Sequence, residues 1–590
     1  MDRQAWIAVT LCVLGLLGWY AYTASHMPPP RQGPVPSVSP TPAAVADASA
    51  TPSASPAPGT VNTATATPAP SAAAFVEKSE VLANGDLELR LTNRGGAITE
   101  AVLLNQTLDN GNRVSLNARD RTPIGAIVEQ PGTDALPEFA MEKQADGSVQ
   151  FENKTPEGVT IRKRFFFPPT TEKKDNFVAE MDVDFRNDGA QPYNNPGYFV
   201  TLGSTHPIHP KDMPAYTRLA WYANKAGSVD VNWFAAQNYP LVGVQKRAAQ
   251  AFYREKTNDL QWAGMTNQFF TDLITPLNAK GVELWAQPFD IKRADGPNLL
   301  GIEGAMGMPG FQIQPGQTTS MRFQIYAGPK LYGRLASLQH NEAEIMNFGM
   351  WKLISQFLLN FMNLIHSWIG NYGFSIVLLT ACVKGVLWPL QNKANKSMRK
   401  MSALAPKMQA LKEKYKDDPT RMNQEVMKLY KEHGVNPVGG CLPMMIQIPI
   451  FFGLFSMLGQ AAELRNARFF WVHDLSQPDT LFTIPGLTWI PILSNASGLP
   501  INILPLIMGA TNLWLMRMTP KTGDSTQQKV MMFMPLIFLI FCYNFAAALA
   551  LYYTTQNLFT ILQLYQNRKL PAPVLEKVAP PGKRQRKGRP

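Results

Sequence analysis

One charged residue, Lys384, interrupts an apolar run at residues 374–390 that otherwise has the composition of a membrane span. A lysine at the depth of the bilayer costs about 3 kcal/mol on insertion scales. A counter-ion, a water-filled cavity, or a side chain that extends to the interface would each lower that cost. Each solution predicts a different kind of protein, and polar residues elsewhere in the apolar runs discriminate among them.

The other apolar runs and the basic segments predict the topology. The run at 530–564 would be a helix of about 52 Å, too long for about 30 Å of hydrocarbon, so we predict two spans joined near Asn544–Ala547. Residues 391–437 and 568–589 are rich in Lys and Arg, which places them in the cytoplasm, whereas 461–499 are balanced in charge. Six transmembrane helices with both termini cytoplasmic fit this pattern; besides 374–390, their apolar runs are 5–22, 442–458, 500–518 and the two halves of 530–564.

The N-terminal half divides into three parts. Residues 1–25 are predicted to be an uncleaved anchor, with a cleaved signal peptide as the alternative. Residues 26–74 are rich in Pro, Ala, Ser and Thr and nearly free of charge, which predicts a disordered tether. Residues 75–340 alternate apolar and polar positions, as in the stretch around Met181, Val183 and Phe185. This period of two predicts a large periplasmic antiparallel β-sandwich.

The C-terminal half begins with an amphipathic segment. Residues 341–370 carry one apolar helical face, which predicts a helix in the plane of the interface. Residues 371–566 are predicted to form a core that contains five of the six transmembrane spans. A basic cytoplasmic helical hairpin at 393–433 is indicated by apolar residues spaced three and four apart. Residues 567–590 form a basic cytoplasmic tail.

Other features carry less functional signal. His206 and His209 have metal-ligand spacing but no third ligand nearby, so we predict no metal site. Three aromatics could line a sugar cleft but suit a sandwich core better: Trp221, Tyr222 and Trp233. There is no phosphate-binding Gly-rich loop of the P-loop kind. We expect a protein that is not an enzyme and needs no cofactor.

Polar residues on several apolar runs indicate what surrounds Lys384. Thr380 lies four residues earlier and shares its helical face. Two more polar residues, Gln447 and Asn512, come from other runs. Ordinary hydrogen bonds between helices are the alternative, worth about 0.6 kcal/mol each. A charge together with several polar groups favours a water-filled cavity, whose last span supplies Tyr552, Tyr553, Gln556, Asn557 and Thr560.

Four motifs resemble the YidC membrane protein insertases of Gram-negative bacteria. They are Asn436-Pro-Val-Gly-Gly-Cys-Leu-Pro-Met-Met-Ile-Gln-Ile-Pro-Ile-Phe451, Leu404-Ala-Pro-Lys-Met-Gln-Ala410, Val472-His-Asp-Leu475 and Gln527-Gln-Lys-Val-Met-Met-Phe-Met-Pro535. The order of segments is also similar, and the close match covers residues 350–566. The resemblance implies an inner-membrane chaperone and insertase that acts alone or with the Sec translocon.

The same resemblance implies roles for individual residues and partners. It implies a hydrophilic groove, open to the cytoplasm and to lipid, that contains Thr380, Tyr552 and Tyr553. The family's groove usually carries arginine, and Lys384 stands at that position. The implied partners are nascent membrane proteins, the lipid bilayer, the Sec translocon, and the ribosome through the basic hairpin and tail.

Two other functions remain open from the residues alone. A small-molecule or ion transporter could use Lys384 as a counter-charge, but it would predict inverted repeats among the spans, which the sequence lacks. A periplasmic carbohydrate-binding protein could simply be anchored by its spans.

Overall fold

A computed structural model describes most of the chain from residue 76 to residue 569. The predicted anchor at 1–25, the tether at 26–74, and the tail from residue 570 lie outside the described residues. Within the described range the gaps are 118–119, 134, 170–175, 211, 239–244, 294–297, 417, 436–437, 491–492, 495–496 and 520–524.

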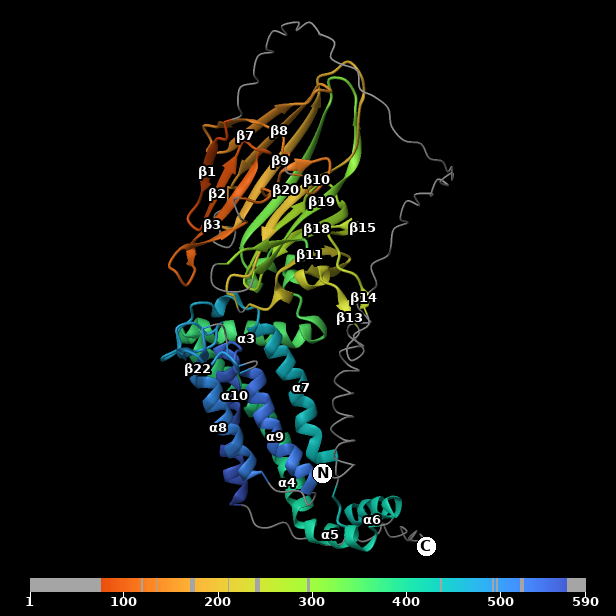
Figure 1. Cartoon of the computed structure of the whole chain (residues 1–590), viewed down its shortest axis with the longest axis vertical. Coiled ribbons are helices and arrows are strands. Elements are labelled where there is room, and N and C mark those ends of the chain that lie inside the picture. Colours follow the sequence, from red (N-terminus) through yellow and green to blue (C-terminus); the bar gives the residue numbers. More distant parts are fainter. Residues whose placement is uncertain are drawn as a thin grey trace, which may run out of the picture.

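Two large antiparallel sheets face each other in the N-terminal half (Figure 1). In spatial order, the nine-stranded sheet contains β12 (Lys225–Asp230), β11 (Arg218–Ala223), β16 (Trp262–Thr266), β17 (Phe270–Pro276), β20 (Thr318–Pro329), β9 (Val178–Asn187), β8 (Val159–Phe166), β7 (Val149–Lys154) and β6 (Ala140–Lys143). The five-stranded sheet contains β15 (Tyr253–Leu260), β18 (Gly281–Ile291), β19 (Leu299–Ile313), β10 (Tyr193–Thr205) and β5 (Ile127–Val128).

Smaller sheets complete the β structure. A four-stranded sheet packs onto the same apolar core, and two short hairpins lie apart from it. The four-stranded sheet contains β1 (Ser79–Ala83), β2 (Leu87–Thr92), β3 (Ala97–Thr107) and β4 (Arg113–Leu116); the hairpins are β13 (Gln237–Asn238) with β14 (Gln245–Arg247), and β21 (Thr480–Ile484) with β22 (Leu499–Asn502).

Alternating side chains explain why these strands form a sandwich. In β9, Met181, Val183 and Phe185 are buried, and the acidic residues between them are not. Every paired position in the large sheets is antiparallel, as the period of two predicted. Of the aromatics considered for a sugar cleft, Trp221 is buried in this core, and Tyr222 and Trp233 pack against it.

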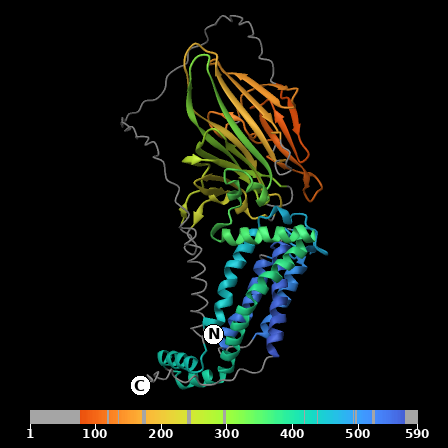
Figure 2. The same ribbon diagram turned by 180° about the vertical axis from the view of Figure 1, so that it is seen from behind.

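The C-terminal half is helical. A short helix, α2 (Tyr332–Leu335), follows the last strand of the sandwich. In Figures 1 and 2 the helix α3 lies across the end of a bundle, between that bundle and the sandwich, and a helical hairpin lies at the bundle's other end. The longer helices are α3 (Lys352–Ile369), α4 (Tyr372–Ala403), α5 (Ala405–Lys414), α6 (Pro419–Glu432), α7 (Val438–Leu458), α8 (Ile503–Met518), α9 (Ser525–Cys542) and α10 (Ala547–Arg568).

The helix boundaries refine the sequence interpretation. The break predicted near Asn544–Ala547 lies between α9 and α10. The hairpin predicted at 393–433 consists of α5 and α6, whereas residues 393–403 continue α4. Among the described residues, α4 is the one helix both long and apolar enough to cross a membrane; Met445–Leu458 and Ile503–Met518 are apolar but shorter. The number of spans therefore stays a prediction.

Candidate functional site

Helix α10 is the centre of the bundle. It packs against α4, α7 and α8. Its first residues, Ala547 to Leu551, are buried and rich in Ala and Leu, which favour helix and allow close packing. The rest of the helix carries polar residues three and four positions apart, which share a face. The helix therefore presents polar side chains to its neighbours inside an apolar bundle.

Lys384 on α4 contacts this polar face. Its Nζ donates to Thr560 Oγ1 at 3.1 Å. The hydroxyl of Thr560 in turn donates to the carbonyl of Gln556, one turn earlier, at 2.8 Å. Within the described part of the chain, no carboxylate lies within ion-pair distance of the Lys384 ammonium. Because an ammonium has three N–H donors, Lys384 keeps donor capacity after bonding Thr560.

Gln447 joins a third helix, α7, to the same face. Its Nε2 donates to Tyr552 Oη and to Gln556 Oε1, each at 3.0 Å. Tyr552 is fully buried, whereas Gln447 and Gln556 are half-buried. Tyr552, Gln556 and Thr560 follow one another at intervals of four residues, so they form one line along α10. This line brings together polar groups of α4, α7 and α10.

Two residues predicted for the same site face elsewhere. Asn557 is buried against α8, where its Nδ2 donates to Thr511 Oγ1 at 3.2 Å. Tyr553 packs its ring against Phe538 and Phe451, with centroids 4.8 and 5.5 Å away. The polar stripe predicted from sequence is therefore divided between different helix interfaces.

The remaining predicted residues are near the site without joining its hydrogen bonds. Thr380 is buried, and its hydroxyl donates to the carbonyl of Ile376 in its own helix at 2.7 Å. Asn512 on α8 is half-buried and makes no side-chain hydrogen bond among the described residues. Neither side chain contacts Lys384 through a hydrogen bond.

The structure also extends the polar face beyond the predicted residues. Gln563 donates to Asn392 Oδ1 at 2.8 Å and to the carbonyl of Trp388 at 3.1 Å. Asn567 donates to Asn392 at 3.1 Å, and its own carbonyl accepts from Arg399 at 2.8 Å. Continuing the spacing of three and four residues past Thr560 would have found Gln563 and Asn567. Their partners on α4 depend on how the two helices are rotated.

The fold and these contacts define a bundle of largely apolar helices with a polar seam at its centre and a large β domain at one end. A sequence profile described as the 60Kd inner membrane protein matches residues 364–572, and one described as the YidC periplasmic domain matches residues 81–361. The chain belongs to the YidC family of membrane protein insertases. Its β domain is the family's periplasmic domain. The chain is therefore a protein of the inner membrane.

Two sequence relatives agree with this assignment. A membrane protein insertase YidC of Geobacter sulfurreducens is 30% identical over 96% of this chain and 98% of the relative. One of Pelobacter propionicus is 33% identical over 71% of each chain. A crystal structure of an active YidC insertase is 18% identical, with a TM-score of 0.34, over 84% of this chain and 93% of that chain.

Proposed function

We propose that this chain inserts newly made proteins into the inner membrane and helps them to fold, through a hydrophilic groove that carries Lys384. The observation that supports this most is that Lys384, among the described residues, has one side-chain partner, the neutral hydroxyl of Thr560. A lysine committed to a fixed ion pair would have little attraction for a passing carboxylate. Here the charge is held by a weak partner and keeps donors for a substrate.

The neighbouring side chains supply the rest of the groove. Gln447, Gln556 and Tyr552 offer amides and a hydroxyl that can replace water around a polar segment. A short external segment of the incoming chain enters near Lys384, so its path across hydrocarbon is shorter. The membrane potential assists acidic segments by about 2.3 kcal/mol per charge for each 100 mV. The apolar segment then passes to lipid, which drives release.

The proposal includes the topology and the partners. Six transmembrane helices would place both termini in the cytoplasm, and the alternation of basic and balanced loops supports this. The proposed domains, in chain order, are the anchor, tether, β domain, interfacial helix, core and tail. The hairpin α5–α6 carries many Lys and Arg side chains, which suits docking to ribosomal RNA or anionic lipid. Cooperation with the Sec translocon is proposed from the family alone.

Lysine at this position has a consequence for selectivity. An arginine would offer a planar fork that binds a carboxylate in two parallel hydrogen bonds. The Lys384 ammonium is a compact charge on a flexible stem. We therefore propose that this groove attracts acidic segments while constraining their orientation less than an arginine would.

Substitutions of Lys384 test the function directly. Lys384→Ala should slow the insertion of substrates with an acidic external segment by about tenfold, and Lys384→Arg should retain near-normal insertion. The measurement is protease protection of a newly made substrate in vesicles that contain the variant. Lys396→Ala is the matched control, because Lys396 is an exposed lysine on the same helix. Normal insertion by Lys384→Ala would contradict the proposed groove.

A further inference from the structure

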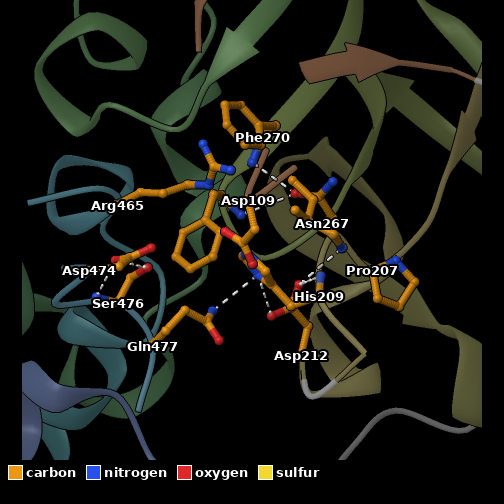
Figure 3. Close-up of polar contacts among 12 residues, drawn as sticks. Asp109, Pro207, His209, Asp212, Asn267, Phe270, Arg465, Asp474, Ser476 and Gln477 are labelled. Atoms are coloured by element: carbon orange, nitrogen blue, oxygen red, sulfur yellow. Dashed lines mark hydrogen bonds and ion pairs between the residues drawn. The ribbon is translucent and has the colours of Figure 1, made fainter. Parts of the chain in front are cut away.

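A polar junction joins the β domain to the membrane half of the chain (Figure 3). His209, in the loop after β10, is buried there with a relative exposure of 6%. Gln477 comes from the segment between α7 and α8, and its Nε2 lies 3.0 Å from His209 Nδ1. From the same segment, Arg465 crosses to the β domain, where it donates to the carbonyl of Thr107 at 2.6 Å. The two halves of the chain are thus joined by side-chain hydrogen bonds.

The segment that carries Gln477 also caps α10. The first residues of a helix have N–H groups without intrahelical acceptors. The residue before α10 is Ala546, which has no side chain able to cap. Instead, Ala547 donates its N–H to the carbonyl of Gln477 at 2.8 Å, and Ala548 donates to the carbonyl of Leu475 at 2.9 Å. The start of α10 therefore depends on the position of this segment.

The same segment caps α8. The residue before that helix is Asn502, whose side chain makes no capping bond. Asp479 Oδ2 accepts from the N–H of Leu504 at 2.7 Å and from Trp471 Nε1 at 3.1 Å. The positive end of the α8 dipole also stabilises a carboxylate at this place. Residues 475–479 thus hold the starts of two bundle helices, and Gln477 ties them to His209.

The two contacts of His209 Nδ1 require opposite states of that nitrogen, one with a proton and one with a free lone pair. Nδ1 lies 3.2 Å from Asp212 Oδ1, a contact that needs a proton on the nitrogen. Gln477 donates to the same nitrogen, which needs a lone pair there. Protonation gives Nδ1–H to Asp212 and removes the acceptor for Gln477. If the amide turns to present its oxygen, that oxygen must share the single N–H with Asp212.

We propose that His209 is a protonation-sensitive latch, through which the β domain holds residues 475–479 and thereby the starts of α8 and α10. With its single proton on Nε2, toward Asp109, neutral His209 accepts the hydrogen bond from Gln477 at Nδ1, and the segment is held. In its protonated form the bond across the junction is lost, and the capping segment loosens. This assigns His209 and Gln477 as positioning residues for the helices that carry the proposed groove.

The charged neighbours fix the direction of the effect. Burial lowers the pKa of His209, but Asp212 and Asp109 raise it, and the pKa lies above its ordinary value of 6.5. Asp109 Oδ1 is 3.5 Å from Nε2, and both acids belong to the β domain, so they remain when the junction opens. Arg465, on the other side, lowers the pKa, as does burial by the junction. Opening would therefore raise the pKa of His209 further. Acidification favours the open junction, and the effect begins at a pH above 6.5.

A small pocket, partly open to solvent, adjoins this site. It has a volume of about 70 Å³ and is lined by residues of the β domain, the capping segment and the turn between α9 and α10, among them Asp212, Gln477 and Asn544. Because Asp212 and Gln477, the two partners of His209 Nδ1, line this pocket, we infer that a proton can reach His209 from solvent without unfolding of the sandwich.

Hydrogen exchange of the full chain in lipid nanodiscs tests the latch. After correction for intrinsic rates, the amides of Ala547 and Ala548 should lose about fivefold in protection between about pH 8 and about pH 5.5. His209→Gln should make their protection independent of pH. Gln477→Ala should give the low protection at both pH values. His206→Gln is the matched control, because His206 is half-buried three residues earlier and contacts the carbonyl of Pro207.

Two results would overturn the latch. One is constant protection of Ala547 and Ala548 in the native chain across this range, and the other is a pH dependence that survives in His209→Gln. Protection of strand β20 reports folding of the sandwich in every variant. If His209→Gln disturbs that strand, Gln477→Ala decides, because it changes the junction from the other side. None of these readouts requires insertion activity, so they fail or succeed separately from the proposed function.

Discussion

The β domain and the helical half stabilise a lysine in different ways. The two examples are Lys163, which is buried in the β domain, and Lys384, which is half-buried in the helical half. Lys163 on β8 is fully buried, and its Nζ donates to the carbonyls of Gly125 and Gly95 at 2.6 and 3.1 Å. The rings of Phe139 and Phe165 lie 5.5 and 5.6 Å from the ammonium. Lys384 is half-buried, and its Nζ donates to one threonine hydroxyl.

The difference lies in the acceptors. Gly95 and Gly125 have φ of +78° and +81°, conformations that glycine adopts at little cost, so their carbonyls are set by the backbone and cannot turn away. Thr560 is a side chain that can exchange partners. We infer that the sandwich uses its lysine to tie two loops together, whereas the bundle keeps its lysine available.

The largest expected effect is on stability, from Lys163→Ala. The substitution leaves two buried carbonyls without a donor and opens a cavity, so the free energy of unfolding of the β domain should fall by about 3 kcal/mol. Urea unfolding of the full chain, followed by tryptophan fluorescence, measures it. Lys384→Ala should change that free energy by less than about 1 kcal/mol. Equal losses in both variants would remove the distinction between the two lysines.

The second effect is a pH dependence confined to the β domain. Burial lowers the pKa of Lys163 from 10.5 to about 7. Between these values the unfolded chain binds a proton that the folded chain does not, so the free energy of unfolding should rise with pH. From pH 7 to pH 9 we expect about 2 kcal/mol, measured by urea unfolding at each pH. In Lys163→Met this rise should be absent; its persistence would point to another group.

The smallest effect concerns the partner of Lys384. Thr560→Val removes the hydroxyl and keeps the shape, at a cost of about 0.6 kcal/mol, so insertion of acidic substrates should change by about threefold or less. Thr380→Val is the matched control, because its hydroxyl bonds the backbone of its own helix. A tenfold loss with Thr560→Val would mean that Lys384 needs a fixed partner, and the contrast with Lys163 would weaken.

Much of this molecule could be predicted from local pattern. The period of two in β9 predicts a strand with one buried face, and polar residues inside apolar runs single out Lys384, Gln447 and Gln556. Helical spacing alone could not tell that Tyr552 faces Gln447 while Tyr553 packs on Phe538. That division depends on the rotation of α10 relative to α7 and α9, which is decided by packing.

Long-range contacts could not be predicted from the sequence, for a different reason. His209 and Gln477 are 268 positions apart, and nothing local to either predicts the other. His206 and His209 have the spacing of metal ligands, but without a third ligand nearby the sequence predicts no metal site there. The surroundings of His209 became visible only once the sandwich was placed against the bundle.

The hydrogen bonds between α10 and α4 have a mechanical consequence. Pro389 lies inside α4, and a proline removes one backbone hydrogen bond and is a common place for a helix to bend. Lys384 binds Thr560 before the proline, and Asn392 binds Gln563 after it. Helix α10 is therefore hydrogen-bonded to α4 on both sides of Pro389, which limits bending of α4 at the proline. A movement of the α5–α6 hairpin would then be transmitted to Lys384 along α4 and α10 together.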